Sequence, residues 1–311
     1  MITIFMGSPD FALPALQSLM SNQYDIRAVY TQPDKRTGRG QQVMACPVKR
    51  FALSQGMRVI QPVSFEDPGE IEVLASLKPD IIIVAAYGRI LPADVLEIPR
   101  YKCINIHPSL LPRYRGPSPL AAPILNGDPV TGVTIMLIER KVDSGPILSQ
   151  VELSISDEDT AESLSERLAE MGARELSSIL PAWVEGKIEP RPQDDSRASY
   201  TRMEVKEDGL LDWKLPAVAL WRRVRAYQPW PGCYFDWKGI RIKVMKAIAL
   251  HDPQGGEMGR VVALPRTAPA RVAVRTVDGL LGLIRVQPEG KREMPAADFS
   301  AGHRDFDGSV L

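Results

Sequence analysis

An apolar run at residues 81–86, with the sequence IIIVAA, restricts the fold more than any other segment of this chain. Side chains alternate between the two faces of a strand, so a strand with this sequence is apolar on both faces. Both faces must then be covered, as they are in a central parallel strand with helices on each side of the sheet. The run therefore predicts a buried, doubly wound sheet.

Shorter β-branched runs recur along the first half of the chain, with helical intervals between them. They occupy residues 2–7, 26–31, 59–61, 104–106 and 133–138. This alternation predicts an α/β fold with a mostly parallel, Rossmann-like sheet. A long helix is expected over residues 159–184, where leucine and methionine recur at helical spacing.

The second part of the chain has a different pattern. Residues 189–208 carry prolines, serines and charges without apolar periodicity, which is typical of a linker between two cores. A helix is expected at 216–227, followed by a small β-barrel. Its strands are expected at 233–237, 241–248, 259–264, 271–276 and 280–286. The predicted division is a first domain at 1–188, a linker at 189–208 and a second domain at 209–311.

Charge is balanced overall but divided unevenly. The 311 residues include 38 Lys and Arg against 38 Asp and Glu, whereas residues 214–292 hold fifteen basic and five acidic residues. A basic domain beside a neutral one is typical of a protein that binds a polyanion. A barrel whose alternate positions happen to be basic explains the same counts, so charge alone leaves both interpretations open.

Cysteine usage and hydropathy indicate the compartment. Cys46, Cys103 and Cys233 are odd in number and far apart, which favours a reducing cytoplasm over a disulfide framework or a zinc site. No apolar run approaches the roughly 20 residues that span a bilayer, and the N-terminus lacks a signal-peptide pattern. We expect a cytoplasmic protein without a membrane partner, and a monomer, because no long amphipathic seam is evident.

Several common catalytic motifs are absent from the sequence. The first strand ends with a single glycine, Gly7, where a dinucleotide-binding turn has three. There is also no P-loop, no HExxH helix and no GxSxG elbow. Nicotinamide chemistry, nucleotide triphosphate hydrolysis, zinc proteolysis and ordinary serine-hydrolase chemistry are therefore disfavoured.

The densest candidate site is the segment from Cys103 to Gly116. Asn105 and His107 point to the same face of a strand because side chains alternate with period two. Pro108 and Pro112 end the strand, which places both polar side chains at its carboxyl end, where open α/β sheets bind ligands. A buried Asn–His pair without chemistry is the competing interpretation. The other two histidines, at 251 and 303, are expected in solvated loops.

Two linked motifs resemble a known family. Residues 105–112 (NIHPSLLP) resemble the signature of the folate-dependent formyltransferases, and residues 132–138 with 142–147 (VDSGPI) resemble the second motif of that family. Other segments are similar to the branch of the family that acts on aminoacylated tRNA, at 7–11 (GSPDF), 31–34 (TQPD), 46–49 (CPVK) and 228–232 (QPWPG). The resemblance covers essentially the whole chain, and it implies a Rossmann-like sheet of the formyltransferase type followed by an OB-like barrel.

The resemblance implies transfer of a formyl group from 10-formyltetrahydrofolate to the α-amino group of methionine on initiator tRNA, without a metal. It implies that Asn105, His107 and Asp143 are catalytic. The Asn105 amide and a protonated His107 would stabilise negative charge on the formyl oxygen. Asp143 would hold His107 charged or relay the amine proton. The sequence leaves the protonation state of His107 open, because burial and a neighbouring carboxylate act in opposite directions.

The resemblance also implies two sets of binding residues. Those expected to contact the reduced folate are Arg89, Ile90, Leu91, Ser109, Leu110, Leu111 and Pro112. Those expected to contact methionyl-tRNA are Phe11, Lys35, Arg36, Arg39, Arg222 and Arg223. The basic, glycine-containing loop at 35–42 is suited to phosphate contacts that order on binding.

Three alternatives remain. A formyltransferase acting on a sugar-nucleotide amine shares the site and a small second domain, although the basic loop at 35–42 argues against it. A glycinamide-ribonucleotide formyltransferase is expected to end near residue 205. A catalytically silent tRNA-binding protein on the same scaffold would not need Asn105, His107 and Asp143 together.

Overall fold

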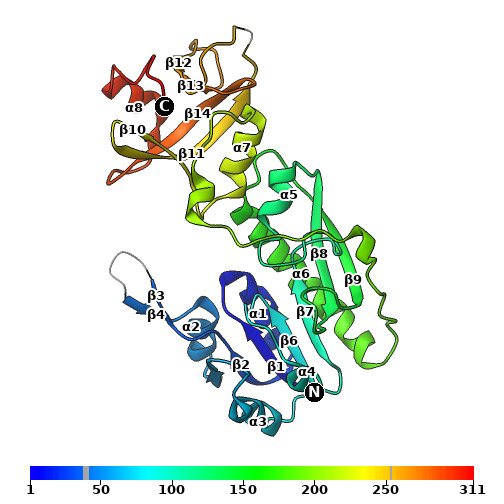
Figure 1. Ribbon diagram of the computed structural model, residues 1–311. Helices are drawn as coiled ribbons and strands as arrows, with labels where there is room; N and C mark the ends of the chain where they lie inside the picture. Colours follow the sequence, from blue (N-terminus) through cyan, green and yellow to red (C-terminus); the bar gives the residue numbers. More distant parts are fainter. Residues whose placement is uncertain (38–41, 253) are drawn as a thin grey trace. The chain divides into compact units, whose positions relative to one another are not determined.

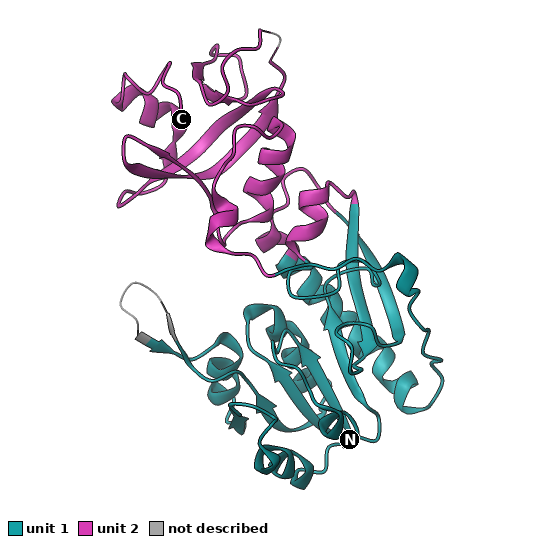
Figure 2. Ribbon diagram, viewed as in Figure 1, with its two compact units in different colours: residues 1–119, 130–154, 165–202 teal, residues 120–129, 155–164, 203–311 magenta. Residues whose placement is uncertain are grey.

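The computed structural model describes residues 1–37, 42–252 and 254–311. These form two compact units (Figure 2). Unit 1 comprises Met1–Pro119, Val130–Ser154 and Ser165–Arg202, and unit 2 comprises Leu120–Pro129, Ile155–Leu164 and Met203–Leu311. The two short segments within unit 2 lie inside the domain predicted at 1–188. That functional division, with its linker at 189–208, stays a prediction.

Unit 1 is built on a seven-stranded sheet in the order β5-β2-β1-β6-β7-β8-β9 (Figure 1). The strands are β1 (Ile2–Gly7), β2 (Asp25–Tyr30), β5 (Val59–Ile60), β6 (Ile81–Ala85), β7 (Cys103–His107), β8 (Val130–Leu137) and β9 (Ile147–Ser154). The first five are parallel to their neighbours, and β8 and β9 are added antiparallel. The predicted mostly parallel sheet is confirmed, and β6 is buried throughout, as its apolar sequence requires.

Helices cover both faces of this sheet. They are α1 (Leu13–Ser21), α2 (Pro47–Ser54), α3 (Pro68–Ser76), α4 (Ala93–Leu96) and α6 (Ala161–Val184). One face packs Ile4, Met6 and Ile82 with Leu74 of α3 and Val95 of α4. Helices α1 and α6 meet at a hydrogen bond of 2.6 Å between Ser18 Oγ and Ser177 Oγ. In the described part of the chain, no helix is long and apolar enough to cross a membrane.

Strand β7 divides its side chains between these two faces. A Cβ atom added at Gly172 of α6 would lie 2.6 Å from Ile106 Cγ2, so α6 packs closely against this face of β7. The neighbouring residues Asn105 and His107 therefore point to the opposite face. The helix contact fixes the strand from behind while its polar side chains face away from α6.

A β-hairpin occupies the ends of the segment that was predicted as a loop at 35–42. Its strands β3 (Lys35–Thr37) and β4 (Gln42–Met44) pair antiparallel. The loop prediction is therefore wrong at both ends, because local composition does not reveal this short backbone pairing. Residues 38–41 lie outside the described part of the chain.

Unit 2 contains an antiparallel sheet of six strands, ordered β10-β11-β14-β13-β12, with β15 paired to β14. The strands are β10 (Cys233–Trp237), β11 (Ile240–Leu250), β12 (Val261–Ala263), β13 (Val272–Arg275), β14 (Leu280–Pro288) and β15 (Met294–Pro295). The helices of this unit are α5 (Ala121–Asn126), α7 (Ala217–Ala226) and α8 (Ala296–Gly302), with a 3-10 turn at Lys206–Gly209. A further 3-10 turn, Asp195–Arg197, belongs to unit 1. Helix α7 packs against β11 and α5. The fold class predicted from the sequence is confirmed in both parts.

Aromatic side chains form much of the core of unit 2. Trp237 meets Phe299 and Phe306 edge to face, at centroid distances of 5.9 and 5.2 Å. The His303 ring stacks on Phe299 at 4.3 Å, and its Nδ1 lies 2.8 Å from the Phe299 carbonyl oxygen. The prediction of a solvated His303 is therefore wrong, because helix α8 brings this ring onto the aromatic cluster.

Replacing Gly172 by valine is expected to lower the free energy of unfolding by about 1–3 kcal/mol, because the added side chain overpacks the contact with Ile106. Gly302→Val is the matched control, since a Cβ atom at this helical glycine meets nothing within 4 Å. Urea unfolding of both variants measures the difference. Equal stability of the two variants would contradict the close packing of α6 on β7.

Candidate active site

Asn105 and His107 lie at the carboxyl end of β7. Asn105 is in register with Val84 of β6 and Met136 of β8, and His107 is opposite Thr134 of β8. The His107 side chain is buried, whereas Asn105 is half-buried. The Asn105 amide forms no side-chain hydrogen bond with any residue that the structure describes. It is therefore free to bind a ligand.

Asp143 lies beside His107, although it comes from the loop between β8 and β9. Its Oδ2 atom is 3.7 Å from His107 Nδ1 and accepts a hydrogen bond of 2.8 Å from the Gly116 N–H. Asp143 has φ +50°, in the left-handed region that non-glycine residues seldom adopt. The loop thus holds a strained residue whose carboxylate faces the imidazole.

The hydrogen bond on the other side of the ring determines the tautomer of His107. Nε2 is 3.1 Å from the Tyr114 carbonyl oxygen, which can only accept, so Nε2 carries the proton. Burial lowers the pKa of His107, while the Asp143 carboxylate and the Tyr114 carbonyl act to raise it. The net direction is downward, so His107 is neutral near pH 7 with an unprotonated Nδ1 facing Asp143. Of the two protonation states that the sequence leaves open, the structure favours the neutral one.

This arrangement can accept a proton. An unprotonated Nδ1 is a base, and the nearby carboxylate stabilises the imidazolium that forms when Nδ1 takes up a proton. The free Asn105 amide on the same strand face can donate a hydrogen bond to an oxygen that gains negative charge. The three residues therefore combine a base, a stabilising charge and an oxyanion donor.

The segment Ser109–Pro112, expected to contact folate, is tied to β8 and β9. Thr134 Oγ1 donates to the Ser109 carbonyl at 2.6 Å and accepts from the Leu111 N–H at 3.1 Å. Gln150 Nε2 donates to the Leu111 carbonyl at 2.8 Å. Ser109 and Leu111 are buried and Leu110 is half-buried. Sequence reasoning missed Thr134 and Gln150, since a lone polar residue in a predicted strand gives no signal of its partner.

Residues 89–91 follow β6 and differ in exposure. Leu91 belongs to the core, whereas the Ile90 side chain is 76% exposed. Arg89 Nε is buried and has no hydrogen-bond partner among the described residues. A buried donor without an acceptor is costly, so a ligand with an acceptor oxygen or nitrogen fits here. The exposed Ile90 gives the same segment an apolar surface.

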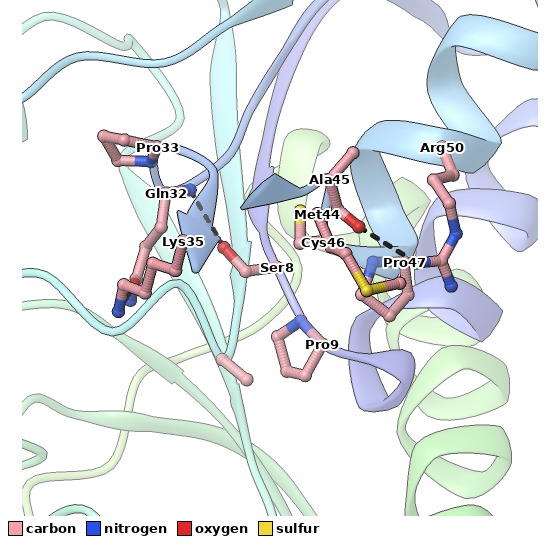
Figure 3. Close-up of a pocket in the computed structure, with 11 residues that line it drawn as sticks. Ser8, Pro9, Gln32, Pro33, Lys35, Met44, Ala45, Cys46, Pro47 and Arg50 are labelled. Atoms are coloured by element: carbon pink, nitrogen blue, oxygen red, sulfur yellow. Dashed lines mark hydrogen bonds between the residues drawn. The ribbon is translucent and has the colours of Figure 1, made fainter. Parts of the chain in front are cut away.

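A pocket of about 490 Å³ opens at the carboxyl ends of β1, β2 and β6 (Figure 3). It is lined by Ser8, Pro9, Gln32, Pro33, Lys35, Met44, Ala45, Cys46, Pro47, Arg50 and Ala86. Ser8 Oγ accepts from the Gln32 N–H at 3.0 Å, and Arg50 donates to the Ala45 carbonyl at 2.9 Å. Because β6 is the neighbour of β7 in the sheet, the pocket opens at the same edge as Asn105 and His107.

The residues expected to contact methionyl-tRNA are not all brought to this pocket. Phe11, in the 3-10 turn Asp10–Ala12, is buried and does not line it. Lys35 lines the pocket and donates to Gln32 Oε1 at 2.6 Å. Arg36 lies in β3, and Arg39 is outside the described residues.

Arg222 and Arg223 belong to helix α7 of unit 2. Both are half-buried. A Cβ atom added at Gly127 would lie 2.1 Å from Arg222 Cζ, so this guanidinium packs on the turn that ends α5. Gly127 has φ +70° and caps that helix. Arg222 therefore has a packing role within unit 2.

Two profiles of known protein families match the sequence of this chain. The family profile described as Formyl transferase matches residues 1–180, and the profile described as Formyl transferase, C-terminal domain, matches residues 205–304. The chain belongs to the formyl transferase family.

Relatives identify a particular branch. The protein called methionyl-tRNA formyltransferase in Roseiflexus sp. (strain RS-1) is 46% identical over 309 residues, which cover 99% of this chain and 94% of that protein. The protein of the same name in Dehalococcoides mccartyi (strain CBDB1) is 45% identical, with coverage of 99% and 97%.

Solved structures share the fold at low identity. An N-formyltransferase from Helicobacter canadensis, in complex with folinic acid and dTDP-3-aminofucose, has a TM-score of 0.66 and 20% identity, covering 91% of this chain and 98% of that one. HypX from Aquifex aeolicus, in complex with tetrahydrofolic acid, has a TM-score of 0.64 and 19% identity, covering 96% and 46%.

The lowered pKa of His107 gives a testable dependence of stability on pH. The unfolded chain binds a proton on this histidine near its ordinary pKa of 6.5, whereas the folded chain binds it only at lower pH. Stability is therefore lost as pH falls below 6.5, and the loss is complete below the folded pKa. His107→Gln removes this dependence, and His251→Gln, at an exposed histidine, retains it. Urea unfolding at pH 7.5 and 5.5 measures the difference in the free energy of unfolding between the two pH values. If His107→Gln showed the same difference as the parent, the buried neutral state would be contradicted.

Proposed function

We propose that this protein transfers the formyl group of 10-formyltetrahydrofolate to the α-amino group of methionine carried by initiator tRNA. The observation that carries the proposal is the geometry of three side chains: His107 Nδ1 lies 3.7 Å from Asp143 Oδ2, and Asn105 lies on the same face of β7 as His107. The acceptor is inferred from the relatives named methionyl-tRNA formyltransferase, which match nearly the whole chain. The proposed partners are reduced folate and initiator methionyl-tRNA, and the proposed state is a monomer in the cytoplasm.

Formyl transfer forms a bond between the amine nitrogen and the formyl carbon, breaks the bond between that carbon and the donor nitrogen, and moves one proton between the nitrogens. His107 Nδ1 accepts the proton as the amine attacks. Asp143 stabilises the imidazolium, and the proton then passes to the leaving nitrogen. Asn105 donates to the formyl oxygen while that oxygen carries negative charge.

The folate-binding residues proposed are those that flank this centre. Ser109, Leu110, Leu111 and Pro112 supply an apolar surface and backbone polar groups held in place by Thr134. Arg89 supplies a buried donor and Ile90 an exposed apolar surface, and Leu91, which is packed in the core beneath them, stays a proposed contact. A flat ligand with polar edges matches such a mixture of surfaces.

The pocket beside β1 is proposed to receive the acceptor end of methionyl-tRNA. Its Met44 and its prolines suit an apolar side chain, and Lys35 and Arg50 suit phosphate or carbonyl oxygens. Phe11, Arg36 and Arg39 stay proposed contacts of this end of the tRNA. Arg222, Arg223 and the other cations of the domain proposed at 209–311 would bind the phosphates of the tRNA.

Asn105→Ala, His107→Ala and Asp143→Asn are each expected to lower the single-turnover rate of formylation by about 10²–10³-fold, since each removes a group that acts on developing charge. The assay uses methionyl-tRNA charged with labelled methionine and 10-formyltetrahydrofolate. Far-UV circular dichroism of each variant checks that the fold is retained. A rate near that of the parent in His107→Ala would overturn the mechanism.

The choice of acceptor separates the proposal from its rivals. The parent protein is expected to formylate initiator methionyl-tRNA and to leave an amino-sugar nucleotide unchanged under the same conditions. Formylation of the sugar nucleotide alone would favour the sugar-amine alternative. Binding of tRNA without formylation would favour a silent tRNA-binding protein.

The salt dependence of tRNA binding tests the role of the basic domain. Lys243 of β11 is exposed and forms no ion pair with any described residue. Lys243→Ala is expected to weaken binding of initiator and elongator tRNA equally and to lower the slope of log K against log salt by about one. Lys187→Ala, a paired lysine of unit 1, is the control. An unchanged slope in Lys243→Ala would contradict a phosphate contact there.

A further inference from the structure

We propose that Gln193 is a positioning residue for formyl transfer, which holds the backbone of Asp143 so that its carboxylate faces His107. This inference rests on the proposed function. Gln193 lies in the segment predicted as a linker, outside both motifs that resemble the family. The residues involved all belong to unit 1.

The Gln193 amide clamps the loop that carries Asp143. Its Nε2 atom donates to the Asp143 carbonyl oxygen at 3.0 Å and to the Gly145 carbonyl oxygen at 2.8 Å. The two carbonyls flank Ser144, so both ends of this short turn are held by one nitrogen. Gly145 cannot be replaced without displacement, since a Cβ atom there would lie 1.9 Å from the Leu137 carbonyl oxygen. The clamp therefore opposes relaxation of the strained Asp143.

Arg115 fixes which way the Gln193 amide points. The guanidinium of Arg115 is fully buried, and its Nε and Nη2 atoms donate to Gln193 Oε1 at 3.0 and 2.8 Å. A guanidinium only donates, so the amide oxygen must face Arg115 and the amide nitrogen must face the two carbonyls. A glutamate here could accept from Arg115 but could not donate to the carbonyls.

The charge of Arg115 is balanced away from Asp143. Arg115 Nη2 pairs with Asp195 Oδ1 at 2.7 Å, and its Nη1 donates to the Tyr200 hydroxyl at 3.2 Å. Gln193 is thus a neutral connection between a buried cation and the catalytic loop. Asp143 keeps its carboxylate available to His107 instead of forming an ion pair with the nearby arginine.

The same segment holds the other polar partners of the site. The Thr201 N–H donates to the Arg115 carbonyl at 2.8 Å, and the Arg115 N–H donates to the Ser199 carbonyl at 2.9 Å. Ser199 Oγ accepts from the Tyr114 N–H at 2.9 Å. The stretch 114–116 pinned in this way provides the carbonyl for His107 Nε2 and the N–H for Asp143 Oδ2. Segment 193–201 therefore fixes both sides of the His107–Asp143 contact.

Gln193→Glu separates positioning from folding, because it keeps the acceptor for Arg115 and removes the two bonds to the turn. A loosened Asp143 is misplaced by a fraction of an ångström to an ångström, for which a loss of up to about 10²-fold in rate is expected. We expect kcat to fall about 10–100-fold, with KM for each substrate within about threefold of the parent. The melting temperature should fall, because two hydrogen bonds are lost and a carboxylate oxygen then faces two carbonyl oxygens, so kcat is compared per folded protein at a temperature where both proteins are folded.

Gln193→Met supplies a second readout, since it matches the length of glutamine without adding charge. The Asp143 carboxylate raises the pKa of His107, so its displacement lowers the apparent pKa on the acidic limb of the pH–rate profile. Asp194→Asn is the matched control, because the Asp194 side chain caps its own turn and, among the residues that the structure describes, hydrogen-bonds to Ser196 alone. This control should keep both kcat and the pH profile of the parent.

The outcomes distinguish the inference from the proposed function. A parent protein that does not formylate methionyl-tRNA overturns the proposed function. An active parent whose Gln193→Glu variant keeps full kcat overturns the positioning role and leaves the function standing. A fall in kcat that is matched by loss of folded protein, with an unshifted pH profile in the folded fraction of either variant, assigns Gln193 a structural role and also overturns the inference.

Discussion

The contact between a buried imidazole and a carboxylate governs this site. Burial alone makes His107 a weaker base, whereas the Asp143 carboxylate partly restores its affinity for a proton. The 3.7 Å separation of Nδ1 and Oδ2 leaves the two unprotonated atoms close without a hydrogen bond between them. The Tyr114 carbonyl keeps the ring proton on Nε2, so Nδ1 is the unprotonated nitrogen that faces the carboxylate.

The polar pair of β7 and the pocket lie at one edge of the parallel sheet. Strand β7 ends in the polar pair, with the 109–112 segment tied to β8 and β9, while the pocket of about 490 Å³ opens at the ends of β1, β2 and β6. The close contact of Gly172 with Ile106 fixes β7 from its other face. Strand β7 thus holds the polar pair, while Lys35 of the hairpin and Arg50 of α2 line the pocket.

The sheet and two of the candidate site residues could be predicted from local sequence patterns, whereas Asp143 and Gln193 could not. The apolar run in β6 and the period-two spacing of Asn105 and His107 are visible in the sequence because strand geometry imposes them. Asp143 needed the family resemblance, since a loop residue with positive φ has no periodic signal. Gln193 was missed because it acts on backbone carbonyls. A polar segment without apolar periodicity is predicted as a linker from its sequence, even when hydrogen bonds order its side chains in the structure.

The protonation of His107 in the ligand-free protein tests the central claim most directly. A ¹⁵N NMR titration of the imidazole reports both the pKa and the nitrogen that carries the proton. The account predicts a neutral ring at pH 7 with the proton on Nε2 and a pKa below 6.5, which Asp143→Asn lowers further. An imidazolium at pH 7, or a neutral ring protonated on Nδ1, would contradict it.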